Sequence, residues 1–420
     1  MANRRVLPTL SLAALLVLAG CGAPFGASTT QGPTPDAAGT ESPATSTAPP
    51  GGQAPSPTES GDESAGSGIG ESDRVAVRNG TLPFNATTVY RRVERLTNEN
   101  RPAFEVVLED RDPVDLGRLE PSPTQTALGL HADEGSMAEC GPIYPGRGTG
   151  DSTVAITKGN VSAGSTELLL VHEFAHSFRT GPSEFVEAVR DGEVADSLTE
   201  AKVVYITDRY ADRYDRRWNG KRPVEMRECI YDNAPGTYRT VAGQVYFGAQ
   251  YVEARVDSPA NFSVIHQSPP RTEEQVVHRL APGEEPVREL TVTAEAGDRW
   301  TVGERRDGGE IELRAWLHAG LSDERVDTAA TGWGAGRIVR FDGDDAAGVA
   351  WTLRMDSPDD ADELAAAVSD LETDLEGRNA TSVETARVGE ETVVAFAGPE
   401  PFVANATASG TAGNVTVAAP

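Results

Sequence analysis

Hydrophobic residues recur at two different spacings in the chain after residue 73, and the two spacings predict different elements. Val89, Val93 and Leu96 lie three or four positions apart, which predicts a helix over 86–100. Residues 104–110 (FEVVLED) have the composition of a strand. By the same criteria we expect a strand over 152–159, helices over 183–191, 197–217, 310–321 and 359–372, and strands near 288–294, 337–341, 349–355 and 391–397. This mixture, in which we find no internal repeat, predicts an α+β fold.

A hydrophobic helix is predicted over 165–179, directly after the strand over 152–159. Ser165 is its expected N-cap, and Thr180-Gly181-Pro182 is its expected stop. Within it, the stretch TELLLVHEFAHSF has apolar residues on most sides, which indicates burial. Polar residues inside such a run cost free energy unless they have partners. The two histidines and the glutamate of this helix therefore need an explanation.

His172 and His176 are four residues apart, so a helix places both imidazoles on one face, where they can reach one ion. Neutral imidazole suits Zn²⁺, and a catalytic zinc keeps three protein ligands and a water. Glu173 would stand beside that water as the general base. The alternative is a pair of helix histidines with ordinary hydrogen-bonded partners. The motif favours zinc, one ion per chain.

The motif itself does not specify the third ligand. Glu200 follows His176 by 24 residues, on the helix predicted over 197–217. This arrangement resembles the gluzincin class of metallopeptidases, in which a glutamate from a following helix completes the zinc site. The competing interpretation is a capping box from Ser197 to Glu200, in which the carboxylate accepts a backbone hydrogen bond. Other candidate ligands are Glu184, Glu187, Asp196 and His278.

A wider resemblance covers roughly 75–375. The chain resembles a family of secreted surface proteins of haloarchaea and bacteria that are regarded as metallopeptidases, because it has the family's motifs in the same order. These motifs are HEFAH, TEAKVVY, PPRTEEQVVH (269–278), GEIELRAWLHAGL (309–321), GWGAGRIVRF (332–341) and DSPDDADELAAAV (356–368). The resemblance implies that Glu200 is the family's glutamate and that His278 matches a family histidine.

Two departures from the family pattern bear on activity. The family's Gly-Asp after the glutamate is Ala201-Lys202 here, and its Gly-Asp-Arg is replaced by residues 334–337 (GAGR). Thermolysin-like enzymes have an aspartate that orients the first histidine, whereas Val203 and Val204 occupy the equivalent positions here. For the oxyanion donor, residue type alone offers four candidates: His278, Tyr205, Tyr231 and Tyr238.

The N-terminus has the features of an export signal. A basic start, an apolar run of about fourteen residues and small residues before Cys21 predict a signal peptide over 1–21, with an uncleaved signal anchor as the alternative. LAGC resembles a lipobox, which implies lipidation at Cys21, and Arg4-Arg5 resembles a twin-arginine signal. We therefore expect an extracytoplasmic protein, lipid-anchored to the membrane at the cell surface.

Composition extends this picture. Residues 22–72 are almost wholly Gly, Ser, Thr, Pro, Ala and acidic residues, which predicts a disordered tether. The net charge is −28, with 65 acidic against 37 basic residues, which argues against nucleic-acid partners. Such an acidic composition is typical of a halophilic archaeon. Nearly all the basic residues are arginines, which a GC-rich genome would also favour. Seven sequons are compatible with a glycoprotein: Asn79, Asn85, Asn160, Asn261, Asn379, Asn405 and Asn414.

Lipidation of Cys21 would leave Cys140 and Cys229, which we expect to form a disulfide outside the cytoplasm, although two buried thiols are the alternative. We expect a zincin-like metallopeptidase domain over 73–280. The α+β region over 281–420 is either a separate module or the far lobe of the same fold. The expected function is zinc-dependent peptide-bond hydrolysis, and the alternative is a non-catalytic surface or envelope-binding protein on a zincin scaffold. The sequence identifies neither the substrate nor the oligomeric state.

Overall fold

The computed structural model describes residues 74–116, 119–130, 137–150, 152–158, 162–178, 192–377 and 381–420. Several sequence predictions lie outside these residues: the signal peptide with Cys21, the tether, the helix over 183–191 with Glu184 and Glu187, and the sequons Asn160 and Asn379. The side chain of Asp196 also lies outside the described part. Within that part, no helix is long and apolar enough to cross a membrane.

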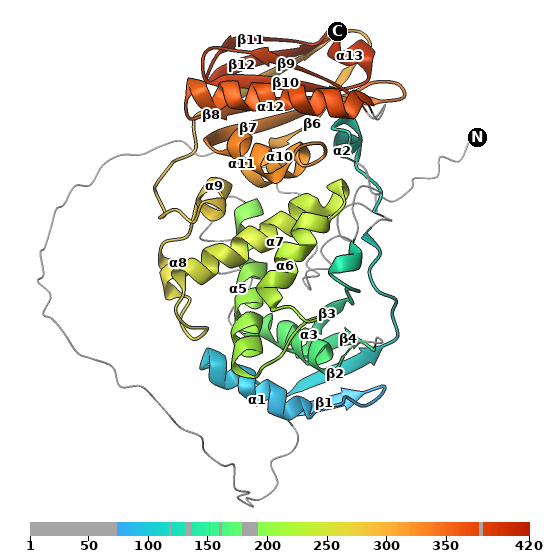
Figure 1. Ribbon diagram of the computed structural model, residues 1–420, viewed down its shortest axis with the longest axis vertical. Helices are drawn as coiled ribbons and strands as arrows, with labels where there is room; N and C mark the ends of the chain where they lie inside the picture. Colours follow the sequence, from blue (N-terminus) through green and yellow to red (C-terminus); the bar gives the residue numbers. More distant parts are fainter. Residues whose placement is uncertain are drawn as a thin grey trace, which may run out of the picture. The chain divides into compact units, whose positions relative to one another are not determined.

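The N-terminal half of the described chain contains a four-stranded sheet in the order β1-β2-β4-β3 (Figure 1). Its strands are Val75–Arg78 (β1), Phe104–Glu109 (β2), Gly146–Gly150 (β3) and Thr153–Thr157 (β4). Strands β1, β2 and β4 run parallel to one another, and β3 pairs with β4 as an antiparallel edge strand. Along β2 every second side chain is buried, which gives this sheet one face in the hydrophobic core.

Helices cover this sheet and extend away from it: Ala86–Thr97 (α1), Ala163–Ala175 (α3), Gly192–Arg213 (α5), Pro223–Asn233 (α6) and Gly236–Arg255 (α7). Buried side chains of α1, α3 and α5 form one hydrophobic cluster with those of the sheet. Every described side chain of α3 from Glu167 to Ala175 is buried, as the apolar run predicted. The N-cap of α3 is Ser162 rather than Ser165, because the Ser162 side chain accepts a hydrogen bond from the Ser165 N–H.

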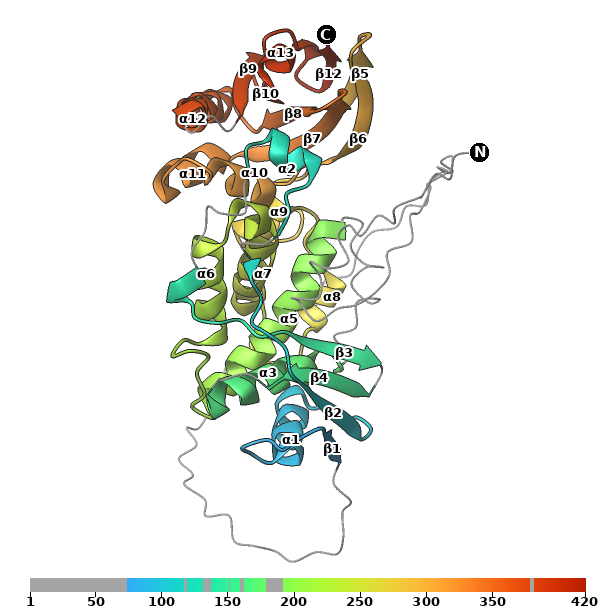
Figure 2. The same cartoon turned by 90° about the vertical axis from the view of Figure 1, so that its right-hand side faces the viewer.

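The C-terminal half contains a five-stranded antiparallel sheet in the order β6-β7-β8-β10-β9. Its strands are Thr301–Asp307 (β6), Trp333–Asp342 (β7), Ala347–Met355 (β8), Ser382–Arg387 (β9) and Thr392–Gly398 (β10). One face packs against the helices Glu310–Leu317 (α10), Asp323–Ala330 (α11) and Pro358–Gly377 (α12). A three-stranded sheet covers the other face (Figure 2), formed by Thr291–Ala296 (β5), Thr407–Thr411 (β11) and Asn414–Ala419 (β12).

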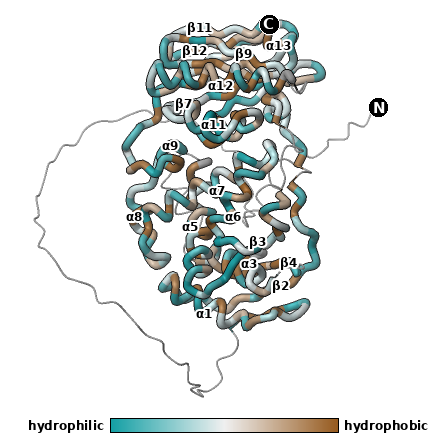
Figure 3. The backbone as a smooth tube through the Cα atoms, in the orientation of Figure 1, coloured by the Kyte–Doolittle hydropathy of each residue, from teal (hydrophilic) through white to brown (hydrophobic). Residues whose placement is uncertain are grey.

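Helix α12 shows how the sequence pattern produces this layer. Hydrophobic and hydrophilic residues alternate in bands along its tube in Figure 3. Its Leu364, Val368 and Leu371 are buried against the sheet, while its acidic residues Asp359 and Glu363 are exposed. Helices were also predicted at the positions of α1, α5 and α10, whereas α3 was predicted from a run that is apolar on most sides. The strand predictions near 104–110, 152–159, 288–294, 337–341, 349–355 and 391–397 correspond to β2, β4, β5, β7, β8 and β10.

The remaining elements are short: Pro123–Ala127 (α2), Met137–Glu139 (a 3-10 helix, η3), Ser263–Gln267 (α8), Glu273–Val277 (α9) and Glu400–Val403 (α13). Although α2 lies early in the chain, it packs against β8 and β10 of the C-terminal sheet. Beside it, the Trp316 indole donates to the Leu128 carbonyl at 3.0 Å. The described residues from Arg74 to Pro420 belong to one compact unit, and the fold is α+β.

Helices α5 and α7 approach closely at Gly248. A Cβ added at this glycine would lie 2.7 Å from the Ser197 carbonyl oxygen and 3.1 Å from the Ala201 Cβ. A larger residue would therefore push α5 and α7 apart.

We predict that Gly248→Ala destabilises the protein by about 1–3 kcal/mol, because the steric cost of overpacking exceeds the roughly 1 kcal/mol that alanine gains in helix propensity. The matched control is Gly164→Ala on α3, where an added Cβ meets nothing closer than 3.6 Å. Denaturant unfolding measures both variants. Equal stability of the two alanine variants would contradict the close approach of α5 and α7.

Candidate metal centre

The two histidines of α3 lie together at its C-terminal end. The Nε2 atoms of His172 and His176 are 3.3 Å apart, and the two rings meet edge to face. Helical geometry produces this arrangement, because residues four apart are stacked one turn above the other. His172 is 4% exposed, so its imidazole is removed from bulk water.

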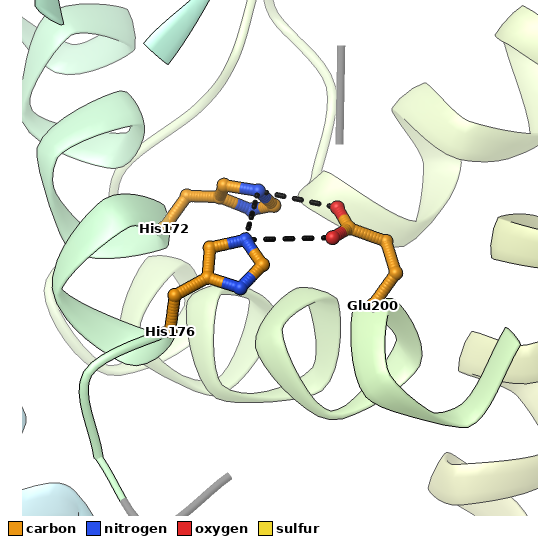
Figure 4. Close-up of side chains that lie close together, drawn as sticks. All are labelled: His172, His176 and Glu200. Carbon is orange, nitrogen blue, oxygen red and sulfur yellow. Dashed lines mark hydrogen bonds and ion pairs between the residues drawn. The ribbon is translucent and has the colours of Figure 1, made fainter. Parts of the chain in front are cut away.

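Glu200 of α5 completes the group (Figure 4). Its Oε1 lies 3.2 Å from His172 Nε2, and its Oε2 lies 3.4 Å from His176 Nε2. One potential ligand atom from each of the three residues lies within 4.8 Å of the other two. The structure thus brings together the three residues that the sequence suggested as a metal-binding set, from two helices, and they could hold one metal ion.

The capping-box interpretation of Glu200 is wrong. Helix α5 begins at Gly192, five residues before Ser197, so Ser197 is not at its N-cap. The Glu200 carboxylate points to the histidines (Figure 4). The helix predicted over 197–217 therefore began five residues too late.

Two contacts at opposite ends fix α3 against α5. Near the start of α3, the Glu167 carboxylate accepts hydrogen bonds from Tyr210 Oη of α5 at 2.6 Å and from Arg216 Nε at 2.8 Å. Farther along α3, the histidines meet Glu200, about 15 Å earlier on α5 at 1.5 Å per residue. The later positions of α3 thus face the earlier positions of α5, so the helices run antiparallel and the two contacts set their register.

Glu173 lies in the wall of a small cavity beside the histidines. This cavity has a volume of about 20 Å³, which is room for about one water molecule, and its wall includes His172, Tyr144 and Arg227. Gly146 of β3 lies directly against the Glu173 carboxylate, since a Cβ at this position would collide with it. Glu173 is 2% exposed, and its Oε2 has no hydrogen-bond partner among the described residues.

The two carboxylates of the site have opposite pKa shifts. Burial raises the pKa of Glu173 well above its usual value, and the negative charge of Glu200 adds to this effect, whereas Arg227 opposes it. Burial also acts to raise the pKa of Glu200. Its interactions with His172, His176 and Arg227 outweigh that effect and lower its pKa to about 2. Glu200 is therefore ionised, and Glu173 has a strong affinity for a proton.

Arg227 is the site residue that the sequence did not reveal. It lies on α6, its Nη2 is 3.2 Å from Glu200 Oε1, and it also lines the cavity beside Glu173. No element was predicted between residues 218 and 280. Arg227 lies 27 residues after Glu200 in the chain, and no sequence motif connects the two. Lys202, which replaces the family's aspartate, contacts His266 instead: its Nζ lies 3.2 Å from the His266 Nε2.

The four candidate oxyanion donors differ in the partners of their polar groups. Tyr205 donates its hydroxyl to the Val256 carbonyl, and His278 Nε2 lies 3.0 Å from Glu310 Oε1, so both have partners outside the three-residue group. The Tyr231 hydroxyl is buried without a hydrogen-bond partner among the described residues, and its ring stacks on Tyr246. Tyr238 interacts electrostatically with two residues of the site. Burial raises its pKa to about 12, the charge of Arg227 lowers this value, and the charge of Glu200 raises it.

A disulfide between Cys140 and Cys229 supports one wall of the cavity. It ties the loop after the 3-10 helix to α6, the helix that carries Arg227 and the cavity residues Met226 and Ile230. Of the two possibilities left open for these cysteines, the structure has the bridge.

Residues 300–419 match a family described as a domain of unknown function (DUF8575), which covers the sheet of β6–β10 and the strands β11 and β12 but not the three-residue group. No curated protein and no solved structure matches the chain.

We predict that the protein, purified from zinc-containing buffer, carries about one metal ion per chain, because two imidazoles and a carboxylate meet the ligand requirement of a three-coordinate protein site. His176→Ala should reduce this content to near zero. The matched control is His266→Ala, a histidine on α8 outside the group, which should keep the wild-type content. Elemental analysis of the folded variants measures the ratio, and identical metal content in all three proteins would contradict the assignment.

Proposed function

We propose that the chain is a zinc-dependent metallopeptidase of gluzincin type, anchored by a lipid at Cys21 to the outer side of the membrane. The observation that carries this proposal is the convergence of His172, His176 and Glu200, with an unpartnered glutamate beside them. The proposal includes a zincin-like arrangement for the four-stranded sheet with α3 and α5.

The donor set fits zinc. Two imidazole nitrogens and one carboxylate are the ligands of known catalytic His₂Glu zinc sites, and such sites leave a position for water. The paired charges also fit, because the low pKa of Glu200 keeps it anionic, as a ligand must be. When bound, zinc would supply Lewis-acid activation of a water molecule.

Glu173 is the proposed general base. Its unpartnered Oε2 and the adjoining cavity, which has room for about one water molecule, support this role. The carboxylate would accept a proton from the attacking water and then donate it to the leaving amine. Glu173 must be ionised to accept this proton, and the positive charge of a bound zinc ion would oppose the effect of burial that raises its pKa. Arg227 and Tyr238 are the charged and hydroxyl groups available to stabilise negative charge in the transition state.

A peptide substrate is favoured by the edge strand. The strand β3 has one neighbour, β4, in the described sheet, and its Gly146 lies against Glu173. An extended peptide can add to the open side of such a strand by main-chain hydrogen bonds. A peptide bond would then pass next to the base.

The competing function is a non-catalytic surface or envelope-binding protein on the same scaffold. The size of the cavity favours it, because about 20 Å³ holds a water molecule but no peptide. The replacement of the family's aspartate by Lys202, whose amine contacts His266, favours it too. Activity distinguishes the two functions, because both can retain the metal.

We predict that Glu173→Gln keeps the metal but reduces peptide hydrolysis by about 10²–10⁴-fold, because the amide cannot accept the proton from water. A peptide library measured at high salt, with zinc content determined in parallel, tests this. The control is Glu228→Gln, the same change at an exposed glutamate of α6 whose carboxylate accepts from the Tyr246 hydroxyl; it should keep both metal and turnover. Zinc-loaded wild-type protein without turnover on any peptide would favour the non-catalytic function.

A further inference from the structure

The motif PPRTEEQVVH (269–278) lies outside the proposed zinc site, and most of its polar side chains have local structural roles. Thr272 is the N-cap of α9 and accepts from the Gln275 N–H at 3.0 Å. Glu273 Oε2 accepts from the Ile311 N–H at 2.9 Å, at the start of α10. His278 contacts Glu310 of the same helix. These contacts join α9 to α10, but none of them involves Glu274.

Glu274 has no such role. It is 2% exposed, and its Oε1 is a buried oxygen without a hydrogen-bond partner among the described residues. Burial, a hydrogen bond shared with the Glu285 carboxyl and the charges of Glu310 and Asp356 together raise its pKa to about 9. A buried carboxylate without a positive partner is unfavourable, and it calls for a cation or a proton.

Two further carboxylates face Glu274. One oxygen from each of Glu274, Glu285 and Asp356 lies within 4.8 Å of the other two. Arg288 donates to Asp356 Oδ1 at 2.8 Å and to the Asp356 main-chain oxygen, so it compensates one of the three charges. Its pKa is raised first by Asp356, with a smaller contribution from Glu274. The adjoining cavity is also lined by Arg354, but that guanidinium pairs with Glu391 outside the group.

We propose that Glu274, Glu285 and Asp356 form a binding site for a calcium ion, separate from the zinc site. The donors are all carboxylate oxygens, which suit a hard cation rather than zinc. A cavity of about 570 Å³, lined by Glu285 and Asp356, lies beside the group and gives space for the water ligands that complete a calcium shell. Calcium tolerates the irregular geometry of ligands from three separate segments better than magnesium does.

The position of the site gives the ion a structural role. Glu274 belongs to α9, Glu285 to the segment between α9 and β5, and Asp356 to the turn between β8 and α12. An ion shared by these residues would join the α9 segment to the C-terminal sheet. Binding to the folded state alone stabilises a protein by mass action, so calcium should raise the thermal stability of the whole unit.

The experiment uses the full chain, kept saturated with zinc, freed of calcium with a calcium-selective chelator and titrated with CaCl₂ at constant high salt. We expect one saturable calcium site per chain in equilibrium dialysis, and a rise in Tm of roughly 5 °C at a hundred times Kd. Glu285→Gln, a change at an exposed residue, should weaken calcium binding by about tenfold or more, because ligand charge sets calcium affinity. The matched control is Glu295→Gln, which removes the same charge from an exposed residue of β5 outside both the group and the cavity and should bind calcium like the wild type.

Glu274→Gln separates the calcium site from a pair of acids that share a proton. The stability of this variant should no longer respond to calcium. In calcium-free buffer it should be at least as stable as the wild type, because it removes one of three closely spaced carboxylates. A wild-type protein without a saturable calcium site, or calcium binding that is unchanged in both Glu274→Gln and Glu285→Gln, would overturn the proposal. Zinc content should stay at the wild-type value in every variant, so the outcome does not depend on the proposed peptidase activity.

Discussion

The antiparallel contact between α3 and α5 is the constraint on which the rest of the site depends. It places two imidazoles and a carboxylate within 4.8 Å in an environment from which water is almost excluded. Buried polar groups are tolerated only when they satisfy one another, so a small shift between these helices would leave several of them unpaired. The Glu167–Tyr210 hydrogen bond fixes one end of the contact. Gly248 of α7, which faces Ser197, allows α7 to pack closely against α5.

The same contact gives two neighbouring glutamates different chemistry. Glu200 faces two histidines and Arg227, and these interactions make its anion stable despite burial. Glu173 is only one residue from His172, but helical geometry turns it toward β3 and the small cavity, where burial dominates and favours its protonated form. Two carboxylates whose environments drive their pKa values apart are a common basis for dividing binding and proton transfer between like residues.

The sequence predicted those parts of the site that follow from local periodicity. The buried helix and the relative position of His172 and His176 come directly from helical spacing, whereas Glu200 was suggested by the resemblance to gluzincins, with other candidates left open. The sequence did not reveal Arg227, because an arginine on α6 meets Glu200 only after α6 packs against α5. It also misplaced the caps: Ser162 rather than Ser165 begins α3, and α5 begins at Gly192. Capping residues are common throughout a Ser- and Thr-rich chain, so tertiary packing decides which of them is used.

The C-terminal half matters for the site through a chain of packed helices rather than through direct contact with the ligands. Glu273 of α9 caps the start of α10, and Ile311 of α10 packs against Gly243 of α7, where an added Cβ would lie 2.7 Å from its Cγ2. Five residues later on α7, Gly248 lies against α5, the helix of Glu200. Each contact is a close approach that leaves little room for rearrangement. The position of Glu200 therefore depends on the packing of α10 as well as on its own helix. The motif at 269–278 contributes to this packing through the hydrogen bond from the Ile311 N–H to Glu273. The matched family region begins at residue 300 and includes α10, so it contributes to this support without supplying any of the three candidate ligands.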